Sequence, residues 1–148
     1  TLNAVLITKD FVFCLGIGDG DVTFVQNGKA YWMLPPSEQY STSTSSLCYK
    51  PQKALEHFYS TVVRIDGKRK RQNPLFKTGI NPDYIMVSTD GLRNSFVSDD
   101  HFVEKLVSIS KGKPNYSSIK KQGKKWIETL TKESLYQDDI TFCMIFKS

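Results

Sequence analysis

The sequence is poor in the residues on which many metal and nucleophilic sites depend. Among its 148 residues are three cysteines and two histidines, with no Cys-x-x-Cys pair and no histidine partner at metal-ligand spacing. This excludes Cys/His metal clusters and gives no support to Ser-His-Asp or Cys-His catalysis. Gly18-Asp19-Gly20 lacks a following lysine and hydroxyl residue, which excludes a P-loop. Residues 19–30 lack the closing glutamate of a calcium loop.

No stretch of the chain predicts a signal peptide or a membrane span. The apolar opening run, residues 4–15, is interrupted by Lys9 and Asp10 and is too short to cross a bilayer. The chain starts at Thr1 without an initiator methionine, which we interpret as a processed chain or a fragment. Cys14 and Cys143 lie in apolar runs, so we expect buried, unpaired thiols, which favour a reducing compartment, most simply the cytoplasm.

The composition is that of one globular domain, with 39% hydrophobic and 24% charged residues. The net charge of +5 is concentrated in a basic run, residues 68–71, and in a set of lysines at helical spacing. The lysines of that set are Lys120, Lys121, Lys124 and Lys125. We expect both groups to be solvated surface, although the basic run could dock a phosphorylated partner. Neither nucleic acid nor a membrane is the expected partner.

Hydrophobic patterning predicts strands first and helices late. The expected strands are residues 4–8, 11–16, 21–26, 30–34, 61–65, 84–88 and 140–146. Asn27-Gly28 predicts a type I′ hairpin turn, so we expect the first four strands to form an antiparallel meander.

Three helices are expected from end signals and apolar spacing. One begins at Pro51 with Phe58 on its apolar face, one has Ser98 as its N-cap and ends at residues 111–112, and one runs through residues 119–130. This order of elements predicts an α+β fold with an antiparallel β-sheet.

Three short acidic motifs stand at the ends of predicted strands: GIGDGD at residues 16–21, STDGL at 88–92 and QDDIT at 137–141. Carboxylates in such places can converge on Mg²⁺ or Mn²⁺, which prefer oxygen ligands, and glycine allows close approach. Two such ions can clamp a phosphate. Each motif alone is also an ordinary turn or a polar strand start, so the residues by themselves leave both interpretations open.

In their order and context the motifs resemble the protein phosphatase 2C family. There a strand leads to Gly-Asp, a later strand to Ser-Asp-Gly, and the last strand opens with Asp-Asn-x-Thr. This chain has "LGIGDGDV", "IMVSTDGL" and "QDDITFCMIF", and the fit is closest to the divergent bacterial branch. The resemblance implies a β-sandwich flanked by two or more helices. It also implies a hydrolase for phosphoserine or phosphothreonine proteins that uses two Mg²⁺ or Mn²⁺ ions and a metal-activated water, without a phosphoenzyme.

Carried over residue by residue, the resemblance implies that Asp19, Asp90 and Asp138 are metal ligands, or in the case of Asp19 lie at the edge of the metal cluster. Gly91 would support the turn beside Asp90. Which residues of the chain act as catalytic groups stays unknown.

The chain departs from the family pattern in each motif. Gly20 and Asp21 stand where serine and arginine are usual, Asp139 replaces an asparagine, and Arg93-Asn94 replaces a Trp-Asp-like pair. Whether Asp139 or Asp21 substitutes as a ligand stays open.

The family's early Asp-Gly-x-Gly motif and its phosphate-binding arginine have no match in the chain. We therefore expect residues 1–148 to be one domain that lacks its N-terminal part and is inactive alone, with that part or a second copy as a partner. The alternatives are a catalytically inactive phosphatase-like binding module and, third, a binder of anionic surfaces through residues 68–71.

Overall fold

The computed structural model describes residues 2–36, 52, 58–65, 79–111, 116–133 and 139–146. The strands are β1 (Leu2–Ile7), β2 (Phe11–Ile17), β3 (Asp21–Gln26), β4 (Lys29–Trp32), β5 (Phe58–Arg64), β6 (Tyr84–Ser88) and β7 (Phe142–Phe146). The helices are α2 (Asp90–Asn94), α3 (Asp99–Ser110) and α4 (Tyr116–Glu133). Every strand pairing between them is antiparallel, which confirms the predicted α+β class.

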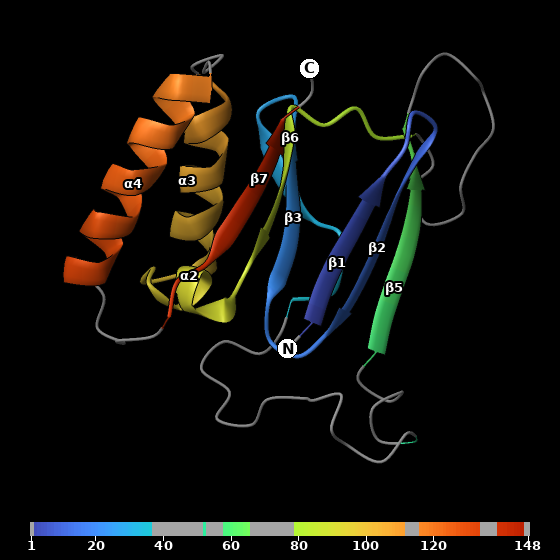
Figure 1. Ribbon diagram of the computed structural model, residues 1–148, viewed down its shortest axis with the longest axis horizontal. Helices are drawn as coiled ribbons and strands as arrows, with labels where there is room; N and C mark the ends of the chain where they lie inside the picture. The colour runs from blue at the N-terminus through green and yellow to red at the C-terminus, as the bar shows by residue number, and fades with distance from the viewer. Residues whose placement is uncertain are drawn as a thin grey trace.

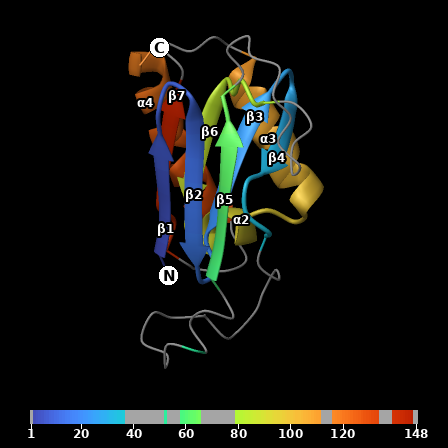
Figure 2. The same cartoon turned by 90° about the vertical axis from the view of Figure 1, so that its right-hand side faces the viewer.

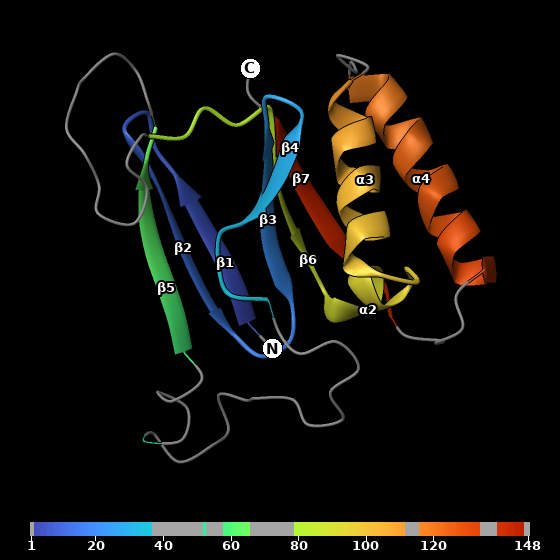
Figure 3. The same cartoon turned by 180° about the vertical axis from the view of Figure 1, so that it is seen from behind.

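The strands form a β-sandwich. One sheet has the order β1-β2-β5 and the other β4-β3-β6-β7. Helices α3 and α4 cover the outer face of the four-stranded sheet (Figures 1 and 3). Figure 2 looks onto the outer face of β1-β2-β5, and no described helix or strand lies over it. None of the described helices has the length and apolar character needed to cross a bilayer.

The predicted four-stranded meander is only partly correct. β1 pairs with β2, and β3 pairs with β4 through a turn in which Asn27 and Gly28 have φ values of 52° and 72°. β2 and β3 lie in different sheets, because the turn after β2, in which Gly18 has a φ of 101°, carries the chain across the sandwich. Sequence alternation does not distinguish a hairpin from such a crossing.

Two hydrophobic cores hold the layers together. The core between the sheets is built around Val12, Cys14, Val22, Phe24, Val63 and Ile85. The core between the four-stranded sheet and the helices contains Val25, Tyr84, Met86, Leu92, Phe102, Leu106, Trp126 and Leu130. β3 and β6 contribute alternate residues to both cores, which explains why both strands are buried along most of their length and why β6 is an almost continuous apolar run.

The two predicted helices that lie within the described residues are confirmed as α3 and α4. The Ser98 Oγ accepts the backbone N–H of His101, and the acidic first turn of α3 follows, as predicted. The four clustered lysines of α4 are exposed. The predicted helix after Pro51 and the basic run 68–71 fall outside the described residues, except that Phe58 belongs to β5, where it pairs with Ile17. Its expected helical placement is therefore wrong.

The two cysteines expected in the core differ. Cys14 is fully buried between the sheets, whereas Cys143 is exposed. On β7 the alternate residues Phe142, Met144 and Phe146 pack on the helix-side core, so Cys143 points to the other face. Since β7 is an edge strand, that face is open to solvent, and the prediction of a buried Cys143 is wrong.

We expect a thiol reagent to separate these two cysteines. Burial raises the pKa of Cys14 to about 12, so both access and thiolate supply are lacking there. In a Cys48→Ser background, a disulfide reagent should modify Cys143 rapidly and Cys14 only as denaturant opens the fold. The matched control is Cys143→Ser in the same background. Rapid native modification of its remaining thiol would contradict the packing of Cys14.

Candidate functional site

One end of the four-stranded sheet brings the acidic motifs together. Asp21 at the start of β3 pairs with Ser88 at the end of β6, and Ser88 pairs with Phe142 at the start of β7. The three strand ends therefore lie in one row across the sheet. Because each motif adjoins one of these ends, segments from three distant parts of the chain meet at a single edge.

The first motif packs tightly against the second. A Cβ added to Gly20 would lie 2.6 Å from the carbonyl oxygen of Ser88 and would also meet the Asn3 side chain. Gly18 has a positive φ of 101°, a conformation that glycine adopts without strain. These two glycines thus let the loop that carries Asp19 lie directly against the end of β6. The Asp19 side chain is half-buried there.

Thr89 ties the second motif to the third. Its backbone N–H donates to the carbonyl of Thr141 at 2.9 Å, and its Oγ1 donates to the carbonyl of Asp139 at 3.0 Å. The same Oγ1 accepts the backbone N–H of Thr141 at 3.0 Å. Residues 139–141 are thereby held beside the residue that precedes Asp90.

Asp90 opens the short helix α2, which the sequence did not predict. Thr89 is its N-cap but makes no capping hydrogen bond, since its hydroxyl serves residues 139–141. Gly91 is buried, and its carbonyl accepts from Ser95 Oγ at 2.6 Å. The half-buried Asp90 side chain lies in the first turn of this helix.

A buried ion pair between Asp21 and Arg93 lies beside the acidic end of the sheet. Asp21 and Arg93 are 2% and 5% exposed, and Arg93 Nη1 lies 3.9 Å from Asp21 Oδ1. Asp99 at the start of α3 receives two hydrogen bonds of 2.8 Å from the same guanidinium. Trp32 Nε1–H donates to Asp21 Oδ1 at 3.2 Å, and its ring faces the Arg93 guanidinium. β3, α2, α3 and β4 are joined through this cluster.

Burial and charge act in opposite directions on these carboxyl groups. Desolvation raises the pKa of Asp21 to about 6, although Arg93 and the Trp32 hydrogen bond oppose the shift. The charges of Asp99 and Asp90 add to the rise, so Asp90 is close enough to be felt electrostatically. The pKa of Asp99 is lowered by its hydrogen bonds to Arg93.

Comparison with known proteins agrees with this arrangement. The sequence profile described as Protein phosphatase 2C matches residues 1–130. The chain belongs to the protein phosphatase 2C family. No curated protein sequence matches it significantly.

Solved phosphatase structures share the fold. Serine/threonine phosphatase Stp1 from Staphylococcus aureus superposes with a TM-score of 0.57 at 14% identity, covering 99% of this chain and 55% of that chain. A bacterial serine phosphatase gives 0.54 at 15% identity, with 96% and 55% covered. A variant described as a bacterial serine phosphatase gives 0.59 at 14% identity, with 99% and 52% covered. This protein phosphatase 2C chain thus spans about half the length of these relatives.

The metal ligands predicted for this protein phosphatase 2C chain remain predictions. The structure brings the segments of Asp19 and Asp90 to the same sheet end, whereas Asp138 lies outside the described residues, next to Asp139. Within the described part of the chain, no three His, Cys, Asp or Glu side chains form a group that could hold a metal ion.

Sequence reasoning missed the Asp21–Arg93–Asp99 cluster. Arg93 was noted only as a departure from the family pattern, and Asp21 as a departure that could substitute as a metal ligand. Their opposite charges at two departing positions were the available signal, but nothing in the spacing indicated that residues 72 positions apart meet in the interior.

We expect Arg93→Ala to lower the free energy of unfolding by about 3 kcal/mol, because it leaves Asp21 buried without its cation. Arg93→Lys should retain part of this stability, since a lysine lacks the two-pronged geometry that Asp99 accepts. The control is Lys124→Ala, which removes an exposed pair with Glu128 and should change stability by less than about 0.5 kcal/mol. Urea denaturation measures all three. Equal losses for Arg93→Ala and the control would contradict the importance of the cluster.

Proposed function

We propose that this chain is part of a metal-dependent protein phosphatase domain that hydrolyses phosphoserine or phosphothreonine in proteins. The observation that carries the proposal is the convergence of three acidic segments at one sheet end in a member of the protein phosphatase 2C family. The names of the structural relatives, serine and serine/threonine phosphatases, support the choice of substrate.

The chemistry of the available groups suits hard divalent cations. Every side chain that we propose as a ligand offers oxygen, as Mg²⁺ and Mn²⁺ prefer. We propose Asp19, Asp90 and Asp138 as ligands, with Gly91 shaping the turn beside Asp90. Two bound ions would supply neutralisation of phosphate charge and a more acidic water. The task of this chain is to hold its carboxylates in fixed positions, which the Thr89 hydrogen bonds and the Gly20 contact favour.

Of the two possible substitute ligands, Asp21 is the weaker candidate. One of its oxygens already accepts from Trp32 and faces Arg93, and the side chain is almost completely buried. We therefore propose a supporting role for Asp21. Asp139 is exposed beside the proposed ligand Asp138 and stays a candidate.

We expect Asp90→Asn to reduce turnover of an aryl phosphate with Mn²⁺ by about 100-fold, because a charged group that stabilises the transition state is lost. The measurement uses the longest natural chain that contains these residues, and calorimetry should show weaker Mn²⁺ binding as well. The control Asp83→Asn alters an exposed aspartate at the opposite end of β6 and should be neutral. Unchanged turnover in Asp90→Asn would show that the assignment of Asp90 as a ligand is wrong, whereas a lack of Mn²⁺-dependent turnover in the unmodified chain would favour the inactive binding module.

We also propose that a further part of the domain covers the outer face of β1-β2-β5. Leu6, Phe13 and Val62 pair in one row across that sheet and so point to the same face. Leu6 is 54% and Val62 49% exposed. An apolar row this open is typical of a binding surface, and the chain covers only 52–55% of its solved relatives. A second copy is the alternative cover.

The covering of this face can be tested in the same longer chain. If the face is buried there, Leu6→Ala should cost about 2–5 kcal/mol of unfolding free energy. Val97→Ala, at a side chain that is 78% exposed, is the matched control and should cost under about 1 kcal/mol. A loss that depends on protein concentration would identify a second copy as the cover. Equal small losses would show that the face stays in water.

We propose a cytoplasmic location because the two cysteines that the structure describes are unpaired. Cys14 and Cys143 are both free thiols in the structure, as expected for a protein of a reducing compartment.

A further inference from the structure

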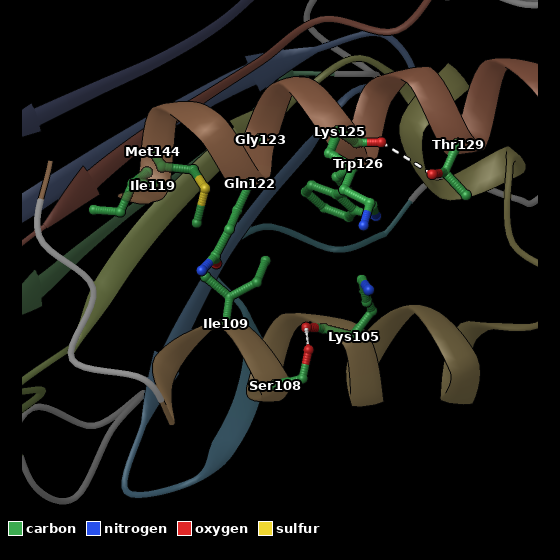
Figure 4. A pocket seen from close by; sticks show the side chains of 10 residues that line it. All are labelled: Lys105, Ser108, Ile109, Ile119, Gln122, Gly123, Lys125, Trp126, Thr129 and Met144. Atoms are coloured by element: carbon green, nitrogen blue, oxygen red, sulfur yellow. Dashed lines mark hydrogen bonds between the residues drawn. The ribbon is translucent and has the colours of Figure 1, made fainter. Parts of the chain in front are cut away.

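A pocket of about 360 Å³ opens between α3 and α4, away from the acidic end of the sheet. Its apolar lining comes from Ile109 of α3, Ile119 of α4 and Met144 of β7. Figure 4 shows Lys105 extending from α3 toward α4, and Gln122 of α4 reaching toward Ile109. The volume is in the range of small-molecule sites, which are mostly apolar with a few polar groups.

The Trp126 side chain beside the pocket carries an unused hydrogen-bond donor. The side chain lines the pocket and is only 8% exposed. Its Nε1–H is buried and has no hydrogen-bond partner among the described residues. A buried indole N–H normally finds an acceptor, so an acceptor bound beside Trp126 would satisfy this donor. The other indole of the chain, that of Trp32, has its acceptor in Asp21.

The charge around the pocket is positive. Both charged residues in its lining are lysines, Lys105 of α3 and Lys125 of α4. Long lysine side chains can bring their ammonium groups over an apolar site while the stems pack beside it. An acceptor that enters the pocket is therefore favoured when it carries negative charge.

Gly123 keeps the middle of the pocket open. It lies within α4, where glycine is less favourable than alanine. A Cβ added there would meet nothing nearer than Phe142 Cζ at 3.8 Å, so close packing does not require the glycine. Its effect is to leave space beside an aromatic cluster in which the Trp126 ring lies 5.1 Å from that of Phe142.

We propose that the α3–α4 pocket binds a small aromatic carboxylate. The ring system lies among the apolar side chains and next to the Trp126 indole, where aromatic contacts are favourable. One carboxylate oxygen accepts the Trp126 Nε1–H, and the charge is balanced by the ammonium groups of Lys105 and Lys125. Binding requires neither the acidic motifs nor a metal ion, so it stands apart from the phosphatase proposal.

The test follows the indole N–H resonances of Trp126 and Trp32 in the ¹⁵N-labelled full-length protein during titration with 1-naphthoate. The Trp126 resonance should shift saturably while that of Trp32 stays in place as an internal reference. The neutral 1-naphthylmethanol should bind about tenfold more weakly, equivalent to the loss of one favourable charge interaction. Absence of a saturable shift, or equal shifts of both indoles, would overturn the proposal.

Variants at Gly123 and the lysines provide the controls. Gly123→Leu should fill the pocket and abolish the shift, whereas Gly123→Ala should retain it; the same spectra report whether each variant is folded. The pair Lys105→Gln and Lys125→Gln should remove the preference for the carboxylate over the alcohol. Lys132→Gln, in the last turn of α4 and outside the pocket lining, should keep that preference. A preference that survives the loss of both pocket lysines would contradict the assigned charge interaction.

Discussion

Hydrogen bonds at Thr89 join the end of β6 to the residues before β7, and the acidic end of the sheet depends on them. The backbone ladder alone aligns β6 with β7 up to Ser88 and Phe142. Beyond that pair the ladder ends. Residue 89 leads into α2, and residues 139–141 precede β7. The Thr89 hydroxyl holds residues 139–141 beside the start of α2, because it donates to the Asp139 carbonyl and accepts the Thr141 N–H.

The second constraint is electrostatic. A carboxylate as buried as Asp21 is unfavourable unless a cation and hydrogen bonds compensate for lost hydration. Arg93 provides the cation and is itself oriented by two hydrogen bonds to Asp99. The start of β3 is thereby linked to α2 and to the first turn of α3. The same link connects the acidic site with the helix whose later residues line the α3–α4 pocket.

Local signals in the sequence predicted local structure well. Asn27-Gly28 predicted the β3–β4 turn, Ser98 predicted the start of α3, and the apolar run 84–88 coincides with β6. Each of these depends on residues close together in the chain. The candidate site was reached through the order of three motifs, and its row of paired strand ends agrees with that reasoning.

What failed depends on contacts between distant residues. The separation of β2 from β3 follows from how the sheets stack, and the exposure of Cys143 from the edge position of β7. Helix α2 was hidden because its five residues are too few for an apolar period. The meeting of Asp21 with Arg93 required a strand and a helix to be placed first, which composition and spacing cannot do.

The central place of β3 has a consequence for the order of folding. We expect this strand to pair early with its hairpin neighbour β4. Its other edge can pair only when β6, about sixty residues further along the chain, has been brought beside it. The second edge of β6 can pair only when β7 is in place. Closing such long loops is entropically costly and slow. We therefore expect the edge of β3 to stay available to wrong partners until late in synthesis, and the acidic end of the sheet to assemble last.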